Sequence, residues 1–296
     1  PIEIICSDDA STDGTPDFLE KYAERSTIPI HVLRQKHNVG IIENFLTAFQ
    51  GTRGTFIAYC DQDDVWLPEK LSCFHAALSP SVHLVCQPSI ITDATLQPSG
   101  QTYFRIQKDV HLEFPATSVK MRPWGHQMIF SRSCLGQLKE LYEAPEFRMS
   151  NFGLNFDLGI PLAASIVGDL LYLRQPQTLF RRHDKATSQA GLLSGAHGND
   201  IRGKVEARTA RIAHEIDLID QAIMILEALD KSSPETAKLC QALISYRRLH
   251  EERVTLAKGK TMIERAMKLP KVVRRSEISH TDVLADFAAA LFGSRL

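Results

Sequence analysis

Three carboxylates crowd the end of one apolar segment. The stretch FIAYCDQDDVWLPEKL, residues 56–71, places Asp61, Asp63 and Asp64 directly after an aromatic, apolar run that is typical of a buried strand. Pro68 then opens a helix at a position that needs no N–H donor. Two unit charges about 4 Å apart repel by about 4 kcal/mol near a protein surface. The sequence therefore predicts cations beside these acids. An oxygen-bound divalent metal is the sharper hypothesis, and a solvated, acid-rich turn is the alternative.

A second pair of acids ends the first apolar segment. Asp8 and Asp9 follow the run IEIICS, just as Asp61 and Asp63 follow theirs. Open α/β sheets place their ligands at the carboxyl ends of strands. Two such strand ends predict one shared crevice, although Asp, Ser and Gly also form turns for local reasons.

The elements that position these acids alternate along the first half of the chain. Short apolar runs predict strands, and amphipathic stretches with proline or glycine at their ends predict helices. In chain order these are a strand at 2–7, a helix from Thr15, a strand at 28–35, a helix at 38–50, a strand at 55–60, a helix to about Leu78 and a strand at 82–87. This order predicts an α/β fold with a mostly parallel sheet and helices on both faces.

The rest of the chain changes character. Residues 88–185 are less regular, with expected strands in HQMIFS and LLYLRQ and an expected helix in FDLGIPLAASIV. Later apolar residues recur at helical spacing, which predicts long helices. We therefore expect an α/β domain over residues 1–186, a Gly- and Ser-rich linker over 187–204 and a helical region over 205–296. Because the sequence starts inside a strand, we also expect a further strand before Pro1.

The composition is that of an ordinary globular protein. The chain has 296 residues and a formal net charge of −1 at pH 7, and it is long enough to bury a large core. Its six cysteines are scattered without a Cys-x-x-Cys pair, which favours reduced thiols over disulfides or zinc. No apolar run reaches membrane-spanning length. We therefore expect a cytoplasmic protein.

Two stretches together resemble a known enzyme family. IEIICSDDASTDGT, followed by NVGIIENFLTAFQGTRGTFIAYCDQDDVWLPEKL, is similar to the family 2 glycosyltransferases of the GT-A fold. The likeness is greatest to the rhamnosyltransferase-like members that build bacterial surface polysaccharides, and it covers about residues 2–185. It implies an inverting, metal-dependent transfer of a sugar from a UDP- or dTDP-linked donor to a saccharide or polyprenyl-linked acceptor, with Mg²⁺ or Mn²⁺ as the cofactor.

The resemblance assigns residues to the donor site. By this resemblance Asp9 contacts the nucleotide base, and Asn38 and Gly40 match an Asn-x-Gly segment where the nucleotide is also approached. Asp63 is then the main metal ligand, and Asp61 lies near the ribose and the metal. A nucleotide diphosphate is a poor leaving group unless its charge is offset, and a divalent metal held by carboxylates offsets it.

On the acceptor side, the resemblance implies a general base in SNFGLNFDLGIPLAAS. Asp157 takes this role, although Phe156 stands where the family usually has Glu or His. The alternative is an acid in the first turn of a helix, favoured by the helix dipole. Gly125 resembles a glycine at which the backbone approaches the acceptor closely. Trp124 beside it is expected either to stack on a sugar face or to pack in the core.

The segment TLFRRHDKATS resembles the Tyr-Arg-x-His segment that follows the last sheet strand in the family. His183 is then a metal or phosphate ligand, and Arg181 or Arg182 is a phosphate partner. A structural histidine is the alternative.

Positive charge gathers late in the sequence. Residues 253–275 carry eight Lys or Arg against one acid, Glu264. Such a segment is expected to lie on an anionic membrane surface, gaining about 1 kcal/mol per basic residue, which places the protein peripherally on the inner face of the cytoplasmic membrane. The alternative is a helix face packed on the rest of the protein. Nucleic acid is not an expected partner, because no aromatic platform accompanies the charge.

Two rival functions remain open from the sequence. Paired aspartates at strand ends also serve phosphoryl chemistry, so a metal-dependent phosphohydrolase or nucleotidyltransferase is one alternative. A non-catalytic, scaffold-like relative is the other, because an opening strand is expected outside this sequence and Phe156 departs from the family pattern.

Overall fold

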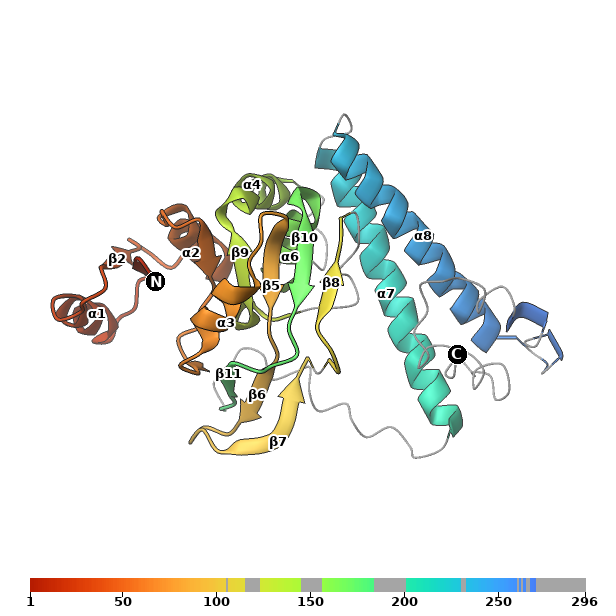
Figure 1. Cartoon of the computed structure of the whole chain (residues 1–296), viewed down its shortest axis with the longest axis horizontal. Coiled ribbons are helices and arrows are strands. Elements are labelled where there is room, and N and C mark those ends of the chain that lie inside the picture. The colour runs from red at the N-terminus through yellow and green to blue at the C-terminus, as the bar shows by residue number, and fades with distance from the viewer. Residues whose placement is uncertain are drawn as a thin grey trace. The chain divides into compact units, whose positions relative to one another are not determined.

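Two compact units make up the chain, and each is described by itself. The computed structural model describes residues 1–104, 106–114, 123–144, 156–183, 201–229, 233–259, 261, 263–264 and 267–269 (Figure 1). The units are Pro1–His183 with Ala228–Leu239, and Asp184–Glu227 with Cys240–Leu296. Residues 187–200 of the expected linker lie outside the described residues.

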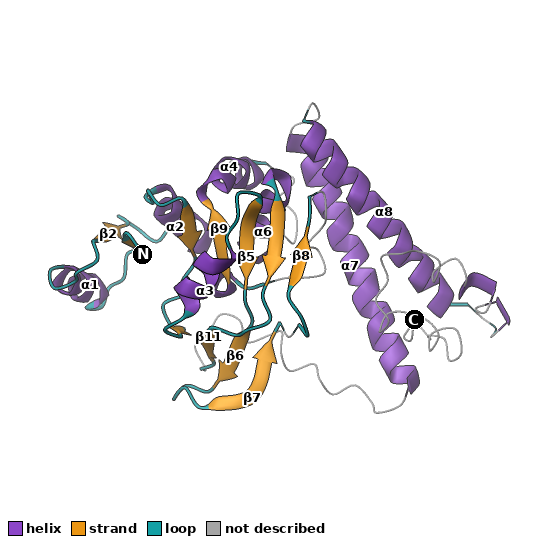
Figure 2. Ribbon diagram, in the orientation of Figure 1, coloured by secondary structure: helices purple, strands orange, loops and turns teal. Residues whose placement is uncertain are grey.

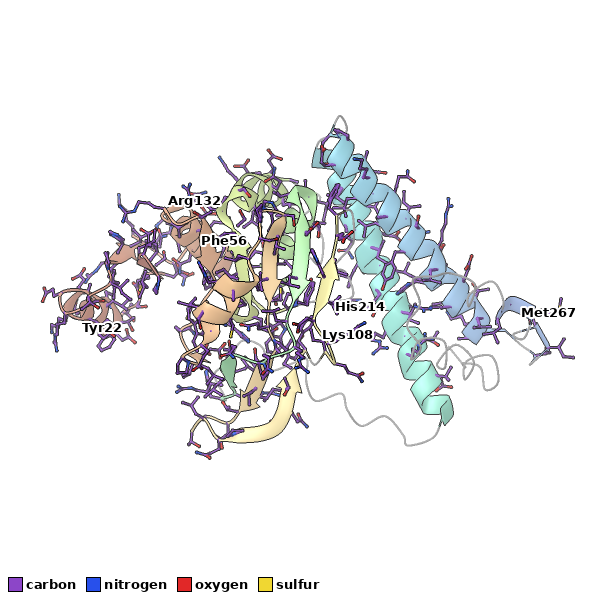
Figure 3. The ribbon with its side chains drawn as sticks, viewed as in Figure 1. Tyr22, Phe56, Lys108, Arg132, His214 and Met267 are labelled. Atoms are coloured by element: carbon purple, nitrogen blue, oxygen red, sulfur yellow. The ribbon has the colours of Figure 1, made fainter. Side chains whose placement is uncertain are left out.

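The larger unit begins with a two-stranded parallel sheet and its helices. These elements are β1 (Ile4–Asp8), α1 (Thr15–Ala23), β2 (Ile30–Arg34) and α2 (Ile41–Gln50). They follow the order that the sequence predicts, and α2 packs against β1. Among the described strands, β1 pairs with β2 alone. Ile2 and Tyr22 are exposed, at 68% and 58%, and Tyr22 projects from α1 in Figure 3. The strand expected before Pro1 stays a prediction.

A five-stranded sheet forms the centre of this unit (Figure 2). Its strands, in spatial order, are β3 (Phe56–Ala58), β9 (Met128–Ser131), β5 (Val82–Cys86), β10 (Asp169–Tyr172) and β8 (Val110–Leu112). The helices that follow in the chain are α3 (Lys70–Ala77), α4 (Leu135–Glu143) and α6 (Phe156–Val167). Phe74 of α3 packs against Val85 and Ile129. Because side chains alternate along strands, Leu84 and Phe130 face the other way, and α6 contacts β5, β9 and β10.

A second, smaller sheet has four strands, and the first of them in the sequence directly follows the acid cluster. Its strands, in spatial order, are β4 (Val65–Trp66), β11 (Thr178–Arg181), β6 (Ser89–Thr92) and β7 (Pro98–Tyr103). The antiparallel pairing places Val65 opposite Leu179. The end of β11, which leads to His183, is therefore held beside the loop of Asp61 to Asp64. Sequence patterns did not predict β4, because a two-residue strand has too few side chains to show a period.

The strand directions are more mixed than the predicted, mostly parallel sheet. Among the described strands, the parallel pairs are β1–β2, β5–β10 and β6–β11. The other pairings are antiparallel. The reason is that β9, which follows a 3₁₀ turn at Gly125–Gln127 and precedes another at Arg132–Cys134, enters between β3 and β5 and opposes both. The α/β class itself is as predicted.

The smaller unit is built on two long helices, α7 (Ile201–Leu229) and α8 (Pro234–Ala257). The helix α7 begins inside the range expected as a linker. Its predicted apolar face is largely buried, with Ile219 and Leu226 fully inaccessible. Charged pairs join the two helices, because Arg247 contacts Asp220 and His250 Nε2 lies 2.8 Å from Glu215 Oε2.

The basic segment 253–275 is only partly described. Residues 260, 262, 265–266 and 270–275 of it lie outside the described residues. Arg253 is 2% exposed, whereas Ile263 and Met267 are 72% and 76% exposed. Figure 3 labels the Met267 side chain, which projects from the ribbon. None of the described helices combines the length and apolar character that crossing a membrane requires.

Candidate active site

The first acidic strand end binds the start of α2. The Asp9 carboxylate accepts hydrogen bonds from the backbone N–H groups of Val39, at 2.7 Å, and Gly40, at 3.0 Å. Asn38 Nδ2 lies 3.5 Å from the Asp9 carbonyl oxygen. Gly40 has a φ of 86°, which favours glycine at this turn. The structure therefore brings Asp9, Asn38 and Gly40 together, and the carboxylate keeps lone pairs for a further donor.

The second acidic strand end divides its carboxylates between two histidines. Asp63 Oδ2 lies 3.0 Å from His183 Nε2. Asp64 Oδ2 and Asp61 Oδ2 lie 2.9 Å and 3.4 Å from His126 Nδ1. The structure thus brings His183 to Asp63, as predicted, and adds His126, which sequence analysis did not select. A histidine therefore lies beside each of these acids.

His126 is held rigidly beneath the acid cluster. Its side chain is 1% exposed, its ring stacks on Phe180 with a centroid distance of 5.2 Å, and Nε2 lies 2.7 Å from Ser89 Oγ. Burial lowers the pKa of His126, but the interactions with Asp61 and Asp64 outweigh this and leave the pKa above its ordinary value. A single histidine in HQMIFS carries no sequence signal for this role, because its partners are distant in the chain.

A buried lysine supports the same cluster from α3. Lys70 is 1% exposed, and its ammonium donates hydrogen bonds to the His126 carbonyl oxygen at 2.6 Å and to Thr178 Oγ1. It also lies 4.9 Å from the centroid of the Trp66 ring, a cation–π distance. Burial lowers the pKa of Lys70 to about 8, and the nearby acids limit this shift. Lys70 therefore remains mainly protonated at pH 7.

Asp157, the residue predicted to be the base, is held at the first turn of α6. Its Oδ1 accepts a hydrogen bond from the Gly125 backbone N–H at 2.9 Å. Burial raises the pKa of Asp157 to about 7, and Asp61 adds to this while Gly125 and His126 oppose it. A carboxyl group with this pKa exchanges protons readily near neutral pH.

Tyr59 lies close both to Gly125, the hydrogen-bond partner of Asp157, and to Asp61 of the acid cluster. A Cβ atom on Gly125 would lie 2.3 Å from Tyr59 Cε1, so only glycine fits above this ring. Burial and the nearby carboxylates of Asp61 and Asp157 raise the pKa of the Tyr59 hydroxyl. Phe156 is 2% exposed and packs edge-on with Phe49, 5.2 Å between centroids. The family's usual Glu or His is therefore replaced here by a core residue, while Asp157 still faces Gly125.

The remaining predicted residues lie beside these groups. Trp124 stacks on Tyr103, with 4.0 Å between centroids, and meets the edge of Phe180. The Arg181 backbone N–H donates to Asp64 Oδ1 at 3.0 Å. The Arg181 Nε atom is buried and is a donor without a hydrogen-bond partner among the described residues.

Comparison with known proteins agrees with this geometry. Residues 1–139 match the family described as Glycosyl transferase family 2. An uncharacterized protein of Mycobacterium tuberculosis is 40% identical over 73 residues, which are 24% of this chain and 21% of that protein. TuaG of Bacillus subtilis, named provisionally as a teichuronic acid biosynthesis glycosyltransferase, is 39% identical over 69 residues, or 23% of this chain and 27% of TuaG. S. aureus TarS 1-349 superposes with a TM-score of 0.50 at 13% identity, covering 98% of this chain and 71% of that one.

Residues 1–139 therefore match a family 2 glycosyltransferase domain, and the chain shares the fold of TarS. This assignment favours a transferase over the phosphohydrolase alternative. The chain spans only about a quarter of the length of these curated relatives, and the TarS likeness concerns the fold alone.

The buried lysine gives a test of how the site is supported. We expect Lys70→Met to lower the free energy of unfolding by about 1–3 kcal/mol, because two buried acceptors lose their donor. Lys139→Met is the matched control, since Lys139 is 61% exposed and pairs only with Glu143 across the surface of α4; its cost should stay below about 1 kcal/mol. Urea unfolding measures both, and equal losses would contradict the supporting role of Lys70.

Proposed function

We propose that this protein is an inverting, metal-dependent glycosyltransferase. It moves a sugar from a UDP- or dTDP-linked donor to a saccharide or polyprenyl-linked acceptor in bacterial cell-surface polysaccharide synthesis. One observation carries the proposal: Asp157 is hydrogen-bonded to Gly125, which packs on the Tyr59 ring, and Asp61 lies close enough to act on both Tyr59 and Asp157. The acid Asp61, on the proposed donor side, and Asp157, the proposed base, therefore lie in one small group of neighbouring residues.

The residues present fit a divalent cation. Asp61, Asp64 and His126 offer ligand atoms that all lie within 4.8 Å of one another, and Asp63 with His183 adds a second nitrogen–oxygen pair. When bound, Mg²⁺ or Mn²⁺ supplies the charge that stabilises a departing diphosphate. Lys70 and the histidines offset the mutual repulsion of the carboxylates. The carboxylates therefore stay close enough together to bind one cation.

The chain's own residues hold the donor and move the proton. Asp9, fixed by the N–H groups at the start of α2, has lone pairs left for an N–H group of the base, and Asn38 and Gly40 border the same position. Arg181 Nε offers a buried donor to a phosphate oxygen. Asp157, held by Gly125, accepts the proton of the acceptor hydroxyl, and Trp124 flanks that approach.

Loss of the donor-side carboxylate should abolish transfer. We expect Asp63→Ala to reduce donor hydrolysis and sugar transfer by more than about 10²-fold, because metal-assisted charge stabilisation contributes several kcal/mol. The fold should persist, since Asp63 is partly exposed and pairs with His183 at the surface. Calorimetry with UDP and dTDP, with and without Mn²⁺, gives the readout. Nucleotide affinity that ignores Mn²⁺ would refute the metal-dependent mechanism.

The base role of Asp157 predicts a separate outcome. We expect Asp157→Asn to keep nucleotide binding and to slow transfer by about 10²- to 10⁴-fold. The group must lose its proton to act, and burial raises its pKa to about 7. The wild-type rate should therefore rise with pH through a midpoint near 7, and the residual rate of the variant should lack that rise. Unchanged turnover in the variant would exclude the role.

The membrane location is also part of the proposal, and the exposed part of the basic segment supports it. Lys258 is exposed, and so are the apolar side chains of Ile263 and Met267. Arg253 is buried and contributes no surface charge. Exposed basic and apolar groups together are typical of segments that bind anionic lipid.

Vesicle sedimentation tests the location. We expect the protein to pellet with phosphatidylglycerol vesicles at low salt but not at high salt, and Lys258→Glu to weaken this binding by about fivefold or more. Lys139→Glu reverses a charge outside the segment and should change binding less. No pelleting at low salt would end the membrane proposal without affecting the catalytic one.

A further inference from the structure

One buried oxygen atom at the acid cluster has no hydrogen bond. The Asp64 side chain is 1% exposed, and its Oδ1 accepts from the Arg181 backbone N–H. Its Oδ2 is buried and has no hydrogen-bond partner among the described residues. A buried polar atom left in this state costs about 1–3 kcal/mol, and more when it is charged. The atom therefore points to a ligand that satisfies it.

Two other ligand atoms face the same point. His126 Nδ1 lies 2.9 Å from Asp64 Oδ2, within ion-pair distance but without hydrogen-bond geometry. Asp61 Oδ2 lies 3.4 Å from the same nitrogen. Atoms bound at about 2.1 Å to adjacent positions of an octahedral ion lie about 3 Å apart. The spacing of this nitrogen and these oxygens therefore suits one shared metal ion.

The imidazole is held as a metal-binding imidazole is held. Its outer nitrogen, Nε2, lies 2.7 Å from Ser89 Oγ, and its ring stacks on Phe180. Because Nε2 faces Ser89, Nδ1 is the nitrogen that faces the two carboxylates, and a divalent cation bound there would take the place of the proton that joins Nδ1 to them in the metal-free protein. Lys70 fixes the His126 backbone from below. The ring cannot turn away without breaking these contacts.

We propose that His126 is a ligand of the divalent cation, together with Asp61 and Asp64, and that its nitrogen makes the site select transition-metal ions over Mg²⁺. This inference rests on the proposed function, in which Asp61, Asp64 and His126 fit a divalent cation and Asp63 with His183 adds a second nitrogen–oxygen pair. Carboxylate oxygens alone suit Mg²⁺, whereas imidazole nitrogen favours first-row transition metals such as Co²⁺. The selectivity of this chain therefore originates in a residue that lies outside the acidic motif.

Metal titration separates this ligand set from the alternative. Calorimetry with CoCl₂, MnCl₂ and MgCl₂ compares the wild type with His126→Asn, which keeps an oxygen or nitrogen near the Nδ1 position. We expect Co²⁺ affinity to fall by about tenfold or more, Mn²⁺ affinity to fall less, and Mg²⁺ affinity to change by less than about threefold. His111→Asn is the matched control, because His111 pairs with Asp169 and has no place in the proposed metal site; it should leave the Co²⁺ to Mg²⁺ ratio close to that of the wild type. An unchanged ratio in folded His126→Asn would overturn the proposal.

A second measurement can contradict the proposal without relying on a folded His126→Asn variant. In the His183→Asn variant loaded with Mn²⁺, pulsed electron paramagnetic resonance should still detect a directly bound nitrogen, and adding His126→Asn should remove it. Absence of nitrogen coupling in the single variant would overturn the proposal even if His126→Asn fails to fold. Neither measurement uses sugar transfer. A bound nitrogen in a protein that transfers no sugar would therefore support this ligand while refuting the proposed function.

Discussion

Carboxylates at positions 61, 63 and 64 can occupy one short loop because a buried ammonium and two histidines lie beneath and beside them. Each pair of such charges repels by about 4 kcal/mol at 4 Å near a protein surface. Lys70 and His126 approach from the core, and His183 approaches from the end of β11. The Lys70 ammonium in turn depends on the acids, because a buried ammonium without nearby negative charge loses its proton. Acids and bases here form one coupled unit.

The strand pairings of the small sheet bring these groups together. The strand β4 leaves the acid loop, β11 carries Thr178 and ends at Arg181, and β6 begins at Ser89. Thr178 and Ser89 lie opposite each other in the β6–β11 pairing. Thr178 accepts a hydrogen bond from Lys70, and Ser89 contacts His126. Asp63 and His183 are 120 residues apart in the chain yet 3.0 Å apart in space. Without these pairings the acid loop has no fixed partner.

Local patterns predict the elements and the acids, but not the groups that stabilise the acids. The helix over residues 156–167 and the strand-end carboxylates depend on nearby residues, so the sequence predicts them. His126 and Lys70 act through residues more than 30 positions away, and a lysine at a helix start is ordinarily a surface residue. The mixed strand directions were missed for the same reason, because the insertion of β9 between β3 and β5 depends on pairing and not on its own pattern.

The aromatic core explains how one site can contain both a charged cluster and a carboxyl group that is protonated near neutral pH. Phe49 and Phe156 exclude water behind Asp157, and this burial raises its pKa. Asp61, on the other side of Tyr59, is partly exposed and faces His126. Two carboxyl groups in different surroundings can take different roles, one as a proton acceptor and one as a fixed charge. Phe156, at 2% exposed, is part of this buried surrounding, and the proposed base role of Asp157 depends on that burial.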